Sequence, residues 1–310
     1  MDKVKELEFL VSIADTGSLT KAAESMGISN PAASRLLTSL ESRLAIRLVE
    51  RNTRRLYFTS EGQEFCDRAR SILSDLADAE SSVNAASFNP SGKLRVSASL
   101  SFAMQQIAPL LPKYRSMYPN VQVHIESSNR YLDLIDNGID VAIRTREYES
   151  DSNISIRKLS KTRRIITASP RYIAKHGKPT TPDELPNHPM LIYVYSNNPY
   201  ELKFTKDKET VAVPVKGVLE SNDGQILRSA ALEGLGLLVQ PTYIVYDDIV
   251  AGRLIPVLED WELPALQINI AYPNRKYLSA KVRSFIDFMV EEFRENDSEK
   301  KWASKFTQGI

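Results

Sequence analysis

The chain has 310 residues, of which 42% are hydrophobic and 25% are charged, and its net charge is +1. This composition is typical of a soluble globular protein, and the length is enough for two domains. No run of about 18 apolar residues predicts a membrane helix, and the charged first residues predict no secretory signal. The single cysteine excludes an intrachain disulfide, so we expect a cytoplasmic protein without a membrane partner.

Hydrophobic periodicity predicts three short helices at the start of the chain. The first covers 4–14 and ends before Gly17, the second covers about 19–26 and stops at Gly27, and the third ends near residue 44. A tight glycine turn between the second and third helices is typical of a helix-turn-helix, whose second helix enters the major groove of DNA.

The third helix combines an apolar stripe with a polar face. We expect Asn30 to cap it and Pro31 to occupy its first position. The residues expected to contact DNA lie on the polar face: Asn30, Pro31, Ser34, Arg35 and Thr38. Arg35 can donate two hydrogen bonds to guanine or to a phosphate. A solvated surface charge is the alternative for a lone arginine, but an exposed face directly after a helix-turn favours DNA contact.

A β-hairpin wing is predicted after the third helix. Two short strand-like runs, 47–49 and 55–58, flank the sequence Arg-Asn-Thr-Arg at 51–54. Arg54 at the tip of this wing suits the narrow, electronegative minor groove. The neighbouring arginines at 51 and 55 fit a scaffold role or phosphate contacts.

A long helix is predicted from Thr59 or Ser60 to about Ala86. Its apolar positions follow a heptad spacing: Phe65, Ala69, Ile72, Leu76, Ala79 and Val83. So narrow an apolar seam on so long a helix is not buried by a small domain. We therefore expect the helix to pair with a second copy in a short coiled coil.

Beyond a turn-rich break at 88–92, strands alternate with helices, which predicts a mostly parallel sheet with helices on both faces. The expected strands are 94–98, 121–125, 140–144, 165–168, 191–194, 237–240 and 267–271, with a hairpin over 201–216. The expected helices are 102–118, 131–137, 171–176, 224–235, 242–250 and 280–293.

At these residues the chain resembles the LysR-type transcriptional regulators over nearly its whole length. The matching segments, specific in their order and spacing, are 9–24 (FLVSIADTGSLTKAAE), 30–35 (NPAASR), 40–44 (LESRL), 47–51 (RLVER), 58–62 (FTSEG), 138–144 (GIDVAIR), 220–223 (ESND) and 234–236 (GLG). Most relatives carry glycine where this chain has Ala45, at a helix end that favours glycine. The turn into the wing is therefore the point of departure from the family.

The resemblance implies an α/β protein with an all-α-type winged helix-turn-helix at its N-terminus. The effector domain would consist of two α/β lobes, as in type 2 periplasmic binding proteins, joined by crossover strands near 165–168 and 267–271. The expected divisions are 1–59 for DNA binding, 60–89 for the dimerising helix and 90–296 for the effector domain. The polar residues 297–310 lack a pattern and predict a mobile tail. Lobe I would comprise about 90–166 and 271–296, and lobe II about 167–270.

Strand ends of the second half point to an effector site. In open α/β sheets, ligands bind at the carboxyl ends of strands, and helix N-termini there offer free N–H groups. The resemblance places effector contacts at these ends: Ser99, Ser101, Phe102, Ser128, Thr145, Ser196, Asn222 and Asp223. Helix capping is the commonest role of Ser and Asn at such positions and is the alternative for each.

Two further sets of residues have two interpretations. Arg144 is either a counter-ion for the ligand or a buried partner of a nearby carboxylate. The aromatic side chains of Tyr193, Tyr195 and Phe204 either line the site or pack in a core, which is the default for such residues.

These observations predict a DNA-binding transcriptional regulator whose activity a small-molecule effector modulates. The expected partners are an interrupted inverted repeat of double-stranded DNA, the effector and further copies of the chain, as a dimer through the long helix and as a tetramer. RNA polymerase is a candidate further partner.

An enzyme is not expected, nor a cofactor. Ser18 to Lys21 fits an S-x-x-K pattern and 221–223 echoes a second β-lactamase element, but these lie in different domains. The chain lacks a zinc-protease helix, a phosphate-binding glycine loop and a dinucleotide motif. Its three histidines lack metal-ligand spacing, and Cys66 has no resolving partner. A transport binding protein would need a secretory signal, whereas a DNA-binding protein without an effector remains an alternative.

Overall fold

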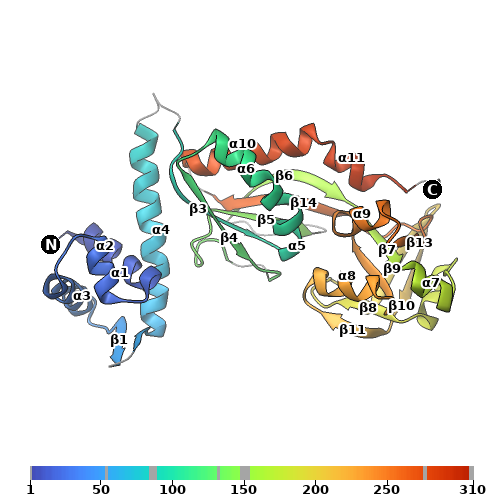
Figure 1. The fold of residues 1–310 in the computed structure, drawn as a ribbon, viewed down its shortest axis with the longest axis horizontal. Helices are drawn as coiled ribbons and strands as arrows, with labels where there is room; N and C mark the ends of the chain where they lie inside the picture. Colours follow the sequence, from blue (N-terminus) through green and yellow to red (C-terminus); the bar gives the residue numbers. More distant parts are fainter. Residues whose placement is uncertain are drawn as a thin grey trace. The chain divides into compact units, whose positions relative to one another are not determined.

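The computed structural model describes residues 2–52, 55–83, 89–130, 133–146, 154–274 and 278–306. They form two compact units, one built mainly on the residues up to Pro90 and one mainly on those from Ser91 onward (Figure 1). In neither described part is a helix long and apolar enough to cross a membrane.

The N-terminal unit contains the three predicted helices. Its elements are α1 (Lys3–Thr16), α2 (Leu19–Ser25), α3 (Asn30–Leu44), β1 (Val49–Asn52), β2 (Arg55–Phe58) and α4 (Ser60–Val83). The predicted cap of α3 is wrong by one residue, because the Ser29 side chain accepts the hydrogen bond from the N–H of Ala32 and Asn30 is already helical. β1 and β2 pair antiparallel and form the predicted wing, but its tip with Arg54 lies outside the described residues.

One apolar core joins these elements. α1 contributes Phe9, Leu10 and Ile13, and side chains of α2, α3, β1 and α4 complete it, including Cys66. Burial raises the pKa of the Cys66 thiol. α4 approaches the chain before the wing so closely that a Cβ at Gly62 would lie 1.9 Å from the carbonyl oxygen of Leu48. Gly62, inside the FTSEG segment, is therefore required by packing.

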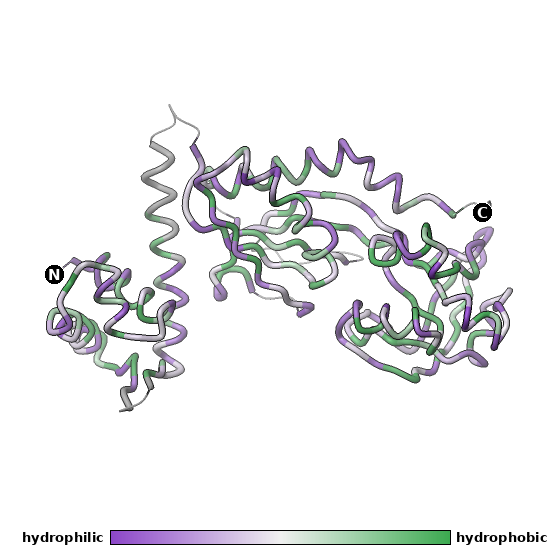
Figure 2. Tube along the Cα trace, viewed as in Figure 1, coloured by the Kyte–Doolittle hydropathy of each residue, from purple (hydrophilic) through white to green (hydrophobic). Residues whose placement is uncertain are grey.

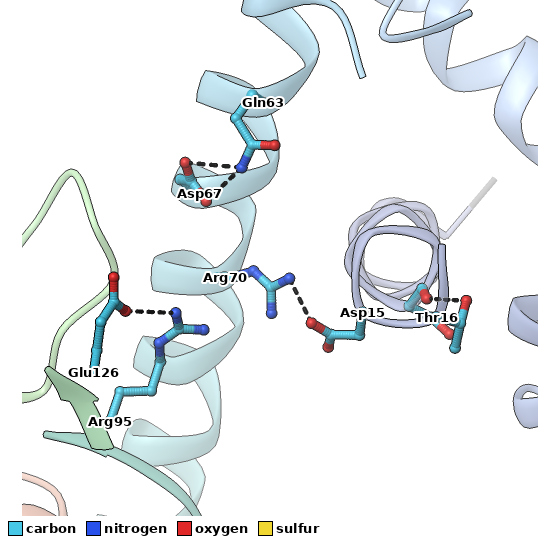
Figure 3. Close-up of polar contacts among 8 residues, drawn as sticks. Asp15, Thr16, Gln63, Asp67, Arg70, Arg95 and Glu126 are labelled. Atoms are coloured by element: carbon cyan, nitrogen blue, oxygen red, sulfur yellow. Dashed lines mark hydrogen bonds and ion pairs between the residues drawn. The ribbon is translucent and has the colours of Figure 1, made fainter. Parts of the chain in front are cut away.

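The predicted coiled-coil seam of α4 divides into two parts. Ala69 is buried and Phe65 packs against the core of its own chain, so these residues do not face a second copy as predicted. Arg70 holds this half of α4 against α1 through an ion pair of 2.6 Å with Asp15 (Figure 3). Ile72 and Leu76 are exposed. The side chains of Ala79 and Val83 lie outside the described residues.

The second unit contains two five-stranded sheets, which define two lobes. The first lobe has the order β4-β3-β5-β14-β6, formed by β4 (Val121–Ser127), β3 (Gly92–Ala98), β5 (Val141–Arg146), β14 (Leu266–Pro273) and β6 (Ile154–Thr162). The second lobe has the order β11-β8-β12-β7-β13, formed by β11 (Gly217–Ser221), β8 (Met190–Tyr193), β12 (Leu237–Pro241), β7 (Arg164–Ala168) and β13 (Ile255–Val257). Hydrophobic residues run along the strands of both sheets (Figure 2).

Both sheets are mixed rather than mostly parallel. β3 is parallel to β4 and β5, and β8 is parallel to β11 and β12, but β14 and β7 are antiparallel to the strands on both sides of them. The reversed strands adjoin the two passages of the chain between the lobes, at Arg163 and over 258–265. The passages therefore adjoin the strands predicted as crossovers, and β6, β11 and β13 were not predicted.

The helices of the second unit differ from prediction at three places. The helix expected over 102–118 is broken into α5 (Leu100–Phe102), a π-helical turn (Ala103–Ile107), a 3₁₀ turn (Ala108–Leu110) and α6 (Leu111–Met117). Two prolines, at 109 and 112, remove backbone donors in this stretch. The helix expected over 131–137 is wrong for the described residues 133–137. There the Asp133 side chain accepts from the N–H groups of Ile135 and Asp136 and forms a turn.

The remaining elements agree closely with the pattern. They are α7 (Pro170–His176), a 3₁₀ helix (Pro182–Asn187), the hairpin β9 (Glu201–Lys206) and β10 (Glu209–Pro214), α8 (Gly224–Leu232), α9 (Thr242–Val250) and α10 (Ala280–Glu295). In Figure 1, α6 and α10 lie beside each other over the first sheet, where Tyr114 packs against Phe285.

The third difference is at the C-terminus, where the predicted mobile tail is wrong for the described residues. Helix α11 (Ser298–Ala303) follows α10, and its Trp302 is only 3% exposed. The lone tryptophan in a polar run supplies enough apolar surface to fix a short helix against the protein.

The chain turns from α3 into the wing through a strained residue, which generates a testable prediction. Ala45 adopts φ 54° and ψ 29°, in the left-handed region that favours glycine. Replacing Ala45 with glycine should raise the free energy of unfolding by about 1 kcal/mol, because glycine removes the Cβ clash of this conformation. Chemical denaturation of the two proteins measures the change.

The opposite substitution is the matched control. Gly17 ends α1 with φ 62° and has no atom within 4 Å of a built Cβ, so Gly17→Ala adds strain without a clash. It should lower stability by about as much. Equal stability of Ala45→Gly and wild type would show that Ala45 is unstrained.

Candidate DNA interface and effector cavity

The predicted DNA-contact residues of α3 share one face. Ala33, Leu37 and Leu40 are buried in the core, which leaves the opposite side of the helix outward. Asn30, Pro31, Arg35 and Thr38 are exposed and Ser34 is half-buried. Arg35 Nε donates to the carbonyl oxygen of Pro31 at 3.3 Å, and the exposed side chain leaves the guanidinium group at the surface.

A buried carboxylate on α1 orients this helix. Glu6 is 2% exposed and accepts hydrogen bonds from Arg43 Nη2 at 2.7 Å, Arg43 Nε at 3.1 Å and Ser39 Oγ at 3.3 Å. Removing one partner of such a pair is strongly unfavourable, since an uncompensated charge stays buried. Glu6 was not singled out in the sequence, although Arg43 belongs to the matching LESRL segment.

A second glutamate fixes α3 to the wing. Glu41 Oε1 accepts from the backbone N–H groups of Leu48 and Val49, at 2.9 and 3.1 Å. The outward face of α3 and the start of the hairpin are thus held in one rigid arrangement. This is the arrangement that a helix in the major groove and a wing on the adjacent backbone require.

In the second unit, a cavity of about 340 Å³ lies between the two sheets, at the ends of β3, β4 and β5. Of the eight predicted effector contacts, five line it: Ser99, Ser101, Ser128, Thr145 and Ser196. Ser99 also caps α5 by accepting from the N–H of Phe102, so capping and lining coexist at this residue. A cavity of this volume falls in the range of small-molecule sites.

The other three predicted contacts do not line the cavity. Phe102 is 1% exposed and packs against Tyr243 and Phe293. Asp223 caps α8, accepting from the N–H groups of Gln225 and Ile226. Asn222 forms a hydrogen bond with the Tyr195 side chain. The hydrogen bonds of Asn222 and Asp223 use the polar groups that the sequence offered as ligand contacts.

Two hydrogen bonds join the lobes at the edge of the cavity. Asn129 Nδ2 donates to Asp223 Oδ2 at 2.7 Å, and Arg130 Nε donates to the hydroxyl of Tyr195 at 2.8 Å. The bond from Arg130 lowers the pKa of Tyr195. Ser128 was predicted from its position after a strand, but the bonds of Asn129 and Arg130 to the second lobe were not.

The structure gives the positions of Arg144 and of the three aromatic residues for which the sequence left two interpretations. Arg144 is both buried and part of the cavity wall. Tyr193 and Tyr195 line the cavity, whereas Phe204 is fully buried in the core of the second lobe. The lining residues that the sequence analysis missed include Arg146, Arg164 and Gln240, which lie within strands and do not follow one as the serines do. In the parts that the structure describes, no cluster of His, Cys, Asp or Glu could hold a metal ion.

Comparisons with known proteins identify the family. Residues 4–63 match the bacterial regulatory helix-turn-helix protein model of the lysR family, and residues 89–294 match the LysR substrate binding domain. The transcriptional regulator CrgA of Neisseria meningitidis is 34% identical over 293 residues, which are 94% of this chain and 97% of CrgA. The chain belongs to the LysR-type transcriptional regulators.

Solved structures agree with this assignment. The structure of CrgA matches with a TM-score of 0.61 and 32% identity, over 94% of this chain and 99% of that one. The full-length virulence activator AphB of Vibrio cholerae matches with a TM-score of 0.59 and 27% identity, over 94% and 99%. This LysR-type regulator therefore binds DNA through its helix-turn-helix and carries a two-lobed domain for a small-molecule effector.

Proposed function

We propose that a dimer of this regulator binds an interrupted inverted repeat, with α3 of each copy in successive major grooves. The exposed face of α3, with Arg35 near its centre, is the observation that carries this proposal. Two recognition helices related by a dimer axis require half-sites about 34 Å apart, which is one turn of DNA. Asn30, Pro31, Ser34 and Thr38 complete the contacts, and Arg54 is proposed to reach the minor groove.

The specificity of α3 is testable at Arg35. Arg35→Ala should lose about 1–3 kcal/mol of binding to an operator selected from random DNA by the wild-type protein, and much less for scrambled DNA. Competition gel shifts measure both affinities. Arg115→Ala, an exposed arginine of α6, is the matched control. An unchanged ratio of operator to scrambled affinity in Arg35→Ala would contradict the assignment of α3.

Dimerisation is proposed through the outer part of α4. Ile72 is 54% exposed and Leu76 is 39% exposed, one helical turn apart on the same side. Two such apolar side chains gain free energy by packing against the same residues of a second copy. A dimer at this helix, and a tetramer through the effector domains, would pair the DNA-binding units.

Leu76→Asp tests the interface. A carboxylate buried there without a partner is strongly unfavourable, so the full chain should dissociate at micromolar concentration in analytical ultracentrifugation and lose cooperative binding to the inverted repeat. The half-exposed position of Leu76 means that the fold of each copy should survive, which circular dichroism checks. Arg68→Asp, on an exposed part of α4, should stay dimeric. Persistence of the dimer in Leu76→Asp would place the interface elsewhere.

We propose further that the effector occupies the cavity between the lobes and changes their separation. A ligand shifts such an equilibrium only by its difference in affinity for the two states. Ser99 and Thr145, which end neighbouring strands, are the proposed direct contacts, with Ser101, Ser128 and Ser196 around them. The output is a change in promoter binding or in contact with RNA polymerase, in the cytoplasm, without catalysis or a cofactor.

A further inference from the structure

The wall of the cavity is positively charged. Arg130, Arg144, Arg146 and Arg164 line it, and none of the described lining residues is Asp or Glu. Each of these guanidinium groups also contacts other residues of the protein. A ligand is therefore indicated by the positive charge that all four carry. A cleft lined by charge of one sign attracts a ligand of the opposite sign, and guanidinium groups bind carboxylates with paired hydrogen bonds.

A buried donor in the same wall is independent evidence. Gln240, at the end of β12, is 3% exposed, and its side-chain Nε2 has no hydrogen-bond partner among the described residues. Buried polar atoms are normally satisfied, so an acceptor on the ligand would complete this site. Gly224 leaves room for the amide, since a Cβ there would lie 3.3 Å from Gln240 Oε1.

Three of the four arginines lie on the first-lobe side of the cavity, and Arg164 of β7 lies on the second-lobe side. Arg144 and Arg146 belong to β5 and Arg130 follows β4, all in the first lobe. The second lobe contributes an apolar wall that includes Met190, Ile192, Leu202, Val215 and Val239. A ligand that fits both sides carries an acid group at one end and an apolar body at the other.

We propose that the effector is a small organic anion, with its acid group at the arginines of the first lobe and its apolar body against the second. This proposal rests on the proposed function of the cavity as the effector site. It assigns a role in ligand specificity to Arg146, one of the four arginines in the wall. It assigns a second such role to Gln240, whose Nε2 has no hydrogen-bond partner among the described residues.

Matched acids and amides test the charge of the ligand. Benzoate, phenylacetate and hexanoate are compared with benzamide, phenylacetamide and hexanamide by thermal unfolding of the full chain. At saturating concentration at least one acid should raise Tm by about 2–4 °C, and its neutral amide should have little effect. Arg146→Met and Gln240→Met should each weaken that acid by about tenfold or more, and Arg115→Met should not.

Two outcomes would overturn the proposal: amides that stabilise as well as their acids, or no acid that stabilises the protein. Operator binding by the same preparations separates this failure from a failure of the proposed function, because the DNA contacts lie in the other unit. If an amide binds and Gln240→Met abolishes that binding, the cavity would remain the effector site and only the proposed class of ligand would change.

A second inference concerns α11, which contacts both lobes. The ring of Trp302 lies 5.7 Å from that of Phe293 on α10 and 5.7 Å from that of Tyr243 on α9. α10 packs on the first lobe through Tyr114, whereas α9 follows β12 of the second lobe. The buried tryptophan therefore fills the junction between the lobes.

The same segment is bonded to the passage between the lobes. Arg163 donates from its backbone N–H to the carbonyl oxygen of Trp302 at 3.4 Å, and from Nη1 to that of Ser304 at 3.0 Å. Farther along, the N–H of Phe306 donates at 3.1 Å to Oε1 of Glu259, in the second passage between the lobes. On the first lobe, Lys158 of β6 pairs with Glu299 at 3.1 Å.

We infer that residues 298–306 form a strap that holds the two lobes at one separation and so sets the response to the effector. The strap begins after residue 294, where the match to the LysR substrate binding domain ends. Any change in lobe separation must either break the contacts of Trp302 and Arg163 or move residues 298–306 together with one lobe. The strap therefore contributes directly to the free-energy difference between the two arrangements of the lobes.

Spin labels on the two lobes test the strap in the full chain. Cysteines replace Ser116 on α6 and Lys175 on α7, both exposed, in a Cys66→Ala background. Double electron-electron resonance should give a broader or shifted distance distribution in Trp302→Ala than in the labelled parent. Truncation after Asn296 should have at least the same effect.

The other tryptophan provides the matched control. Trp261 is partly buried and packs against the core of the second lobe, so Trp261→Ala removes an indole while leaving the contacts of Trp302 with Phe293 and Tyr243 in place. Its distance distribution should equal that of the labelled parent. Unchanged distributions in both Trp302→Ala and the truncated chain would overturn the strap, as would an equal broadening in Trp261→Ala.

Discussion

The passage of the chain between the lobes at Arg163 constrains the rest of the effector domain. Because the chain must return over 258–265, each sheet contains strands of both directions, with β14 and β7 antiparallel to their neighbours. The parallel strands β3, β4 and β5 then end together at the cavity. Arg163 Nη1 also donates to the carbonyl oxygen of Ser304 in the C-terminal segment, and Arg163 Nη2 lies 3.7 Å from Glu259 Oε1. Arg163 thus marks the first passage between the lobes and also holds the C-terminal segment.

Local signals predicted most of the elements. Glycine stops, proline starts and hydrophobic periodicity gave α1 to α3 and α9 nearly to the residue, since these helices follow intrinsic rules of capping and burial. The sequence did not predict β6, whose Arg157, Lys158 and Lys161 break the apolar alternation. β6 lies at the edge of its sheet, where such charges are tolerated and discourage further pairing.

Cavity-lining residues were predicted where their place after a strand is enough to identify them. They were missed where their role depends on hydrogen bonds or packing between distant parts of the chain. Ser99, Ser128 and Thr145 follow strands that the pattern identifies, so a rule about strand ends finds them. Asp223 follows the same rule but its carboxylate is bonded to α8 and Asn129. Gln240 and Glu6 are buried polar residues on apolar elements. The fold gives Glu6 its role through Arg43 and Ser39, and it gives Gln240 a place in the cavity wall.

The larger number of arginines on the first-lobe side of the cavity also gives the proposed effector a direction of action. An anion bound only to the first lobe would satisfy its acid group and leave its apolar body in water. Approach of the second lobe would bury that body, which gains roughly 25 cal/mol for each Å² removed from water. The ligand then binds the closed arrangement more tightly than the open one, and this difference in affinity is what drives a population shift. A neutral apolar ligand lacks an anchor on the first lobe, and a small inorganic anion lacks a body for the second. A molecule with both parts couples binding to closure, and this closure acts on the contacts that Trp302 makes with Phe293 and Tyr243.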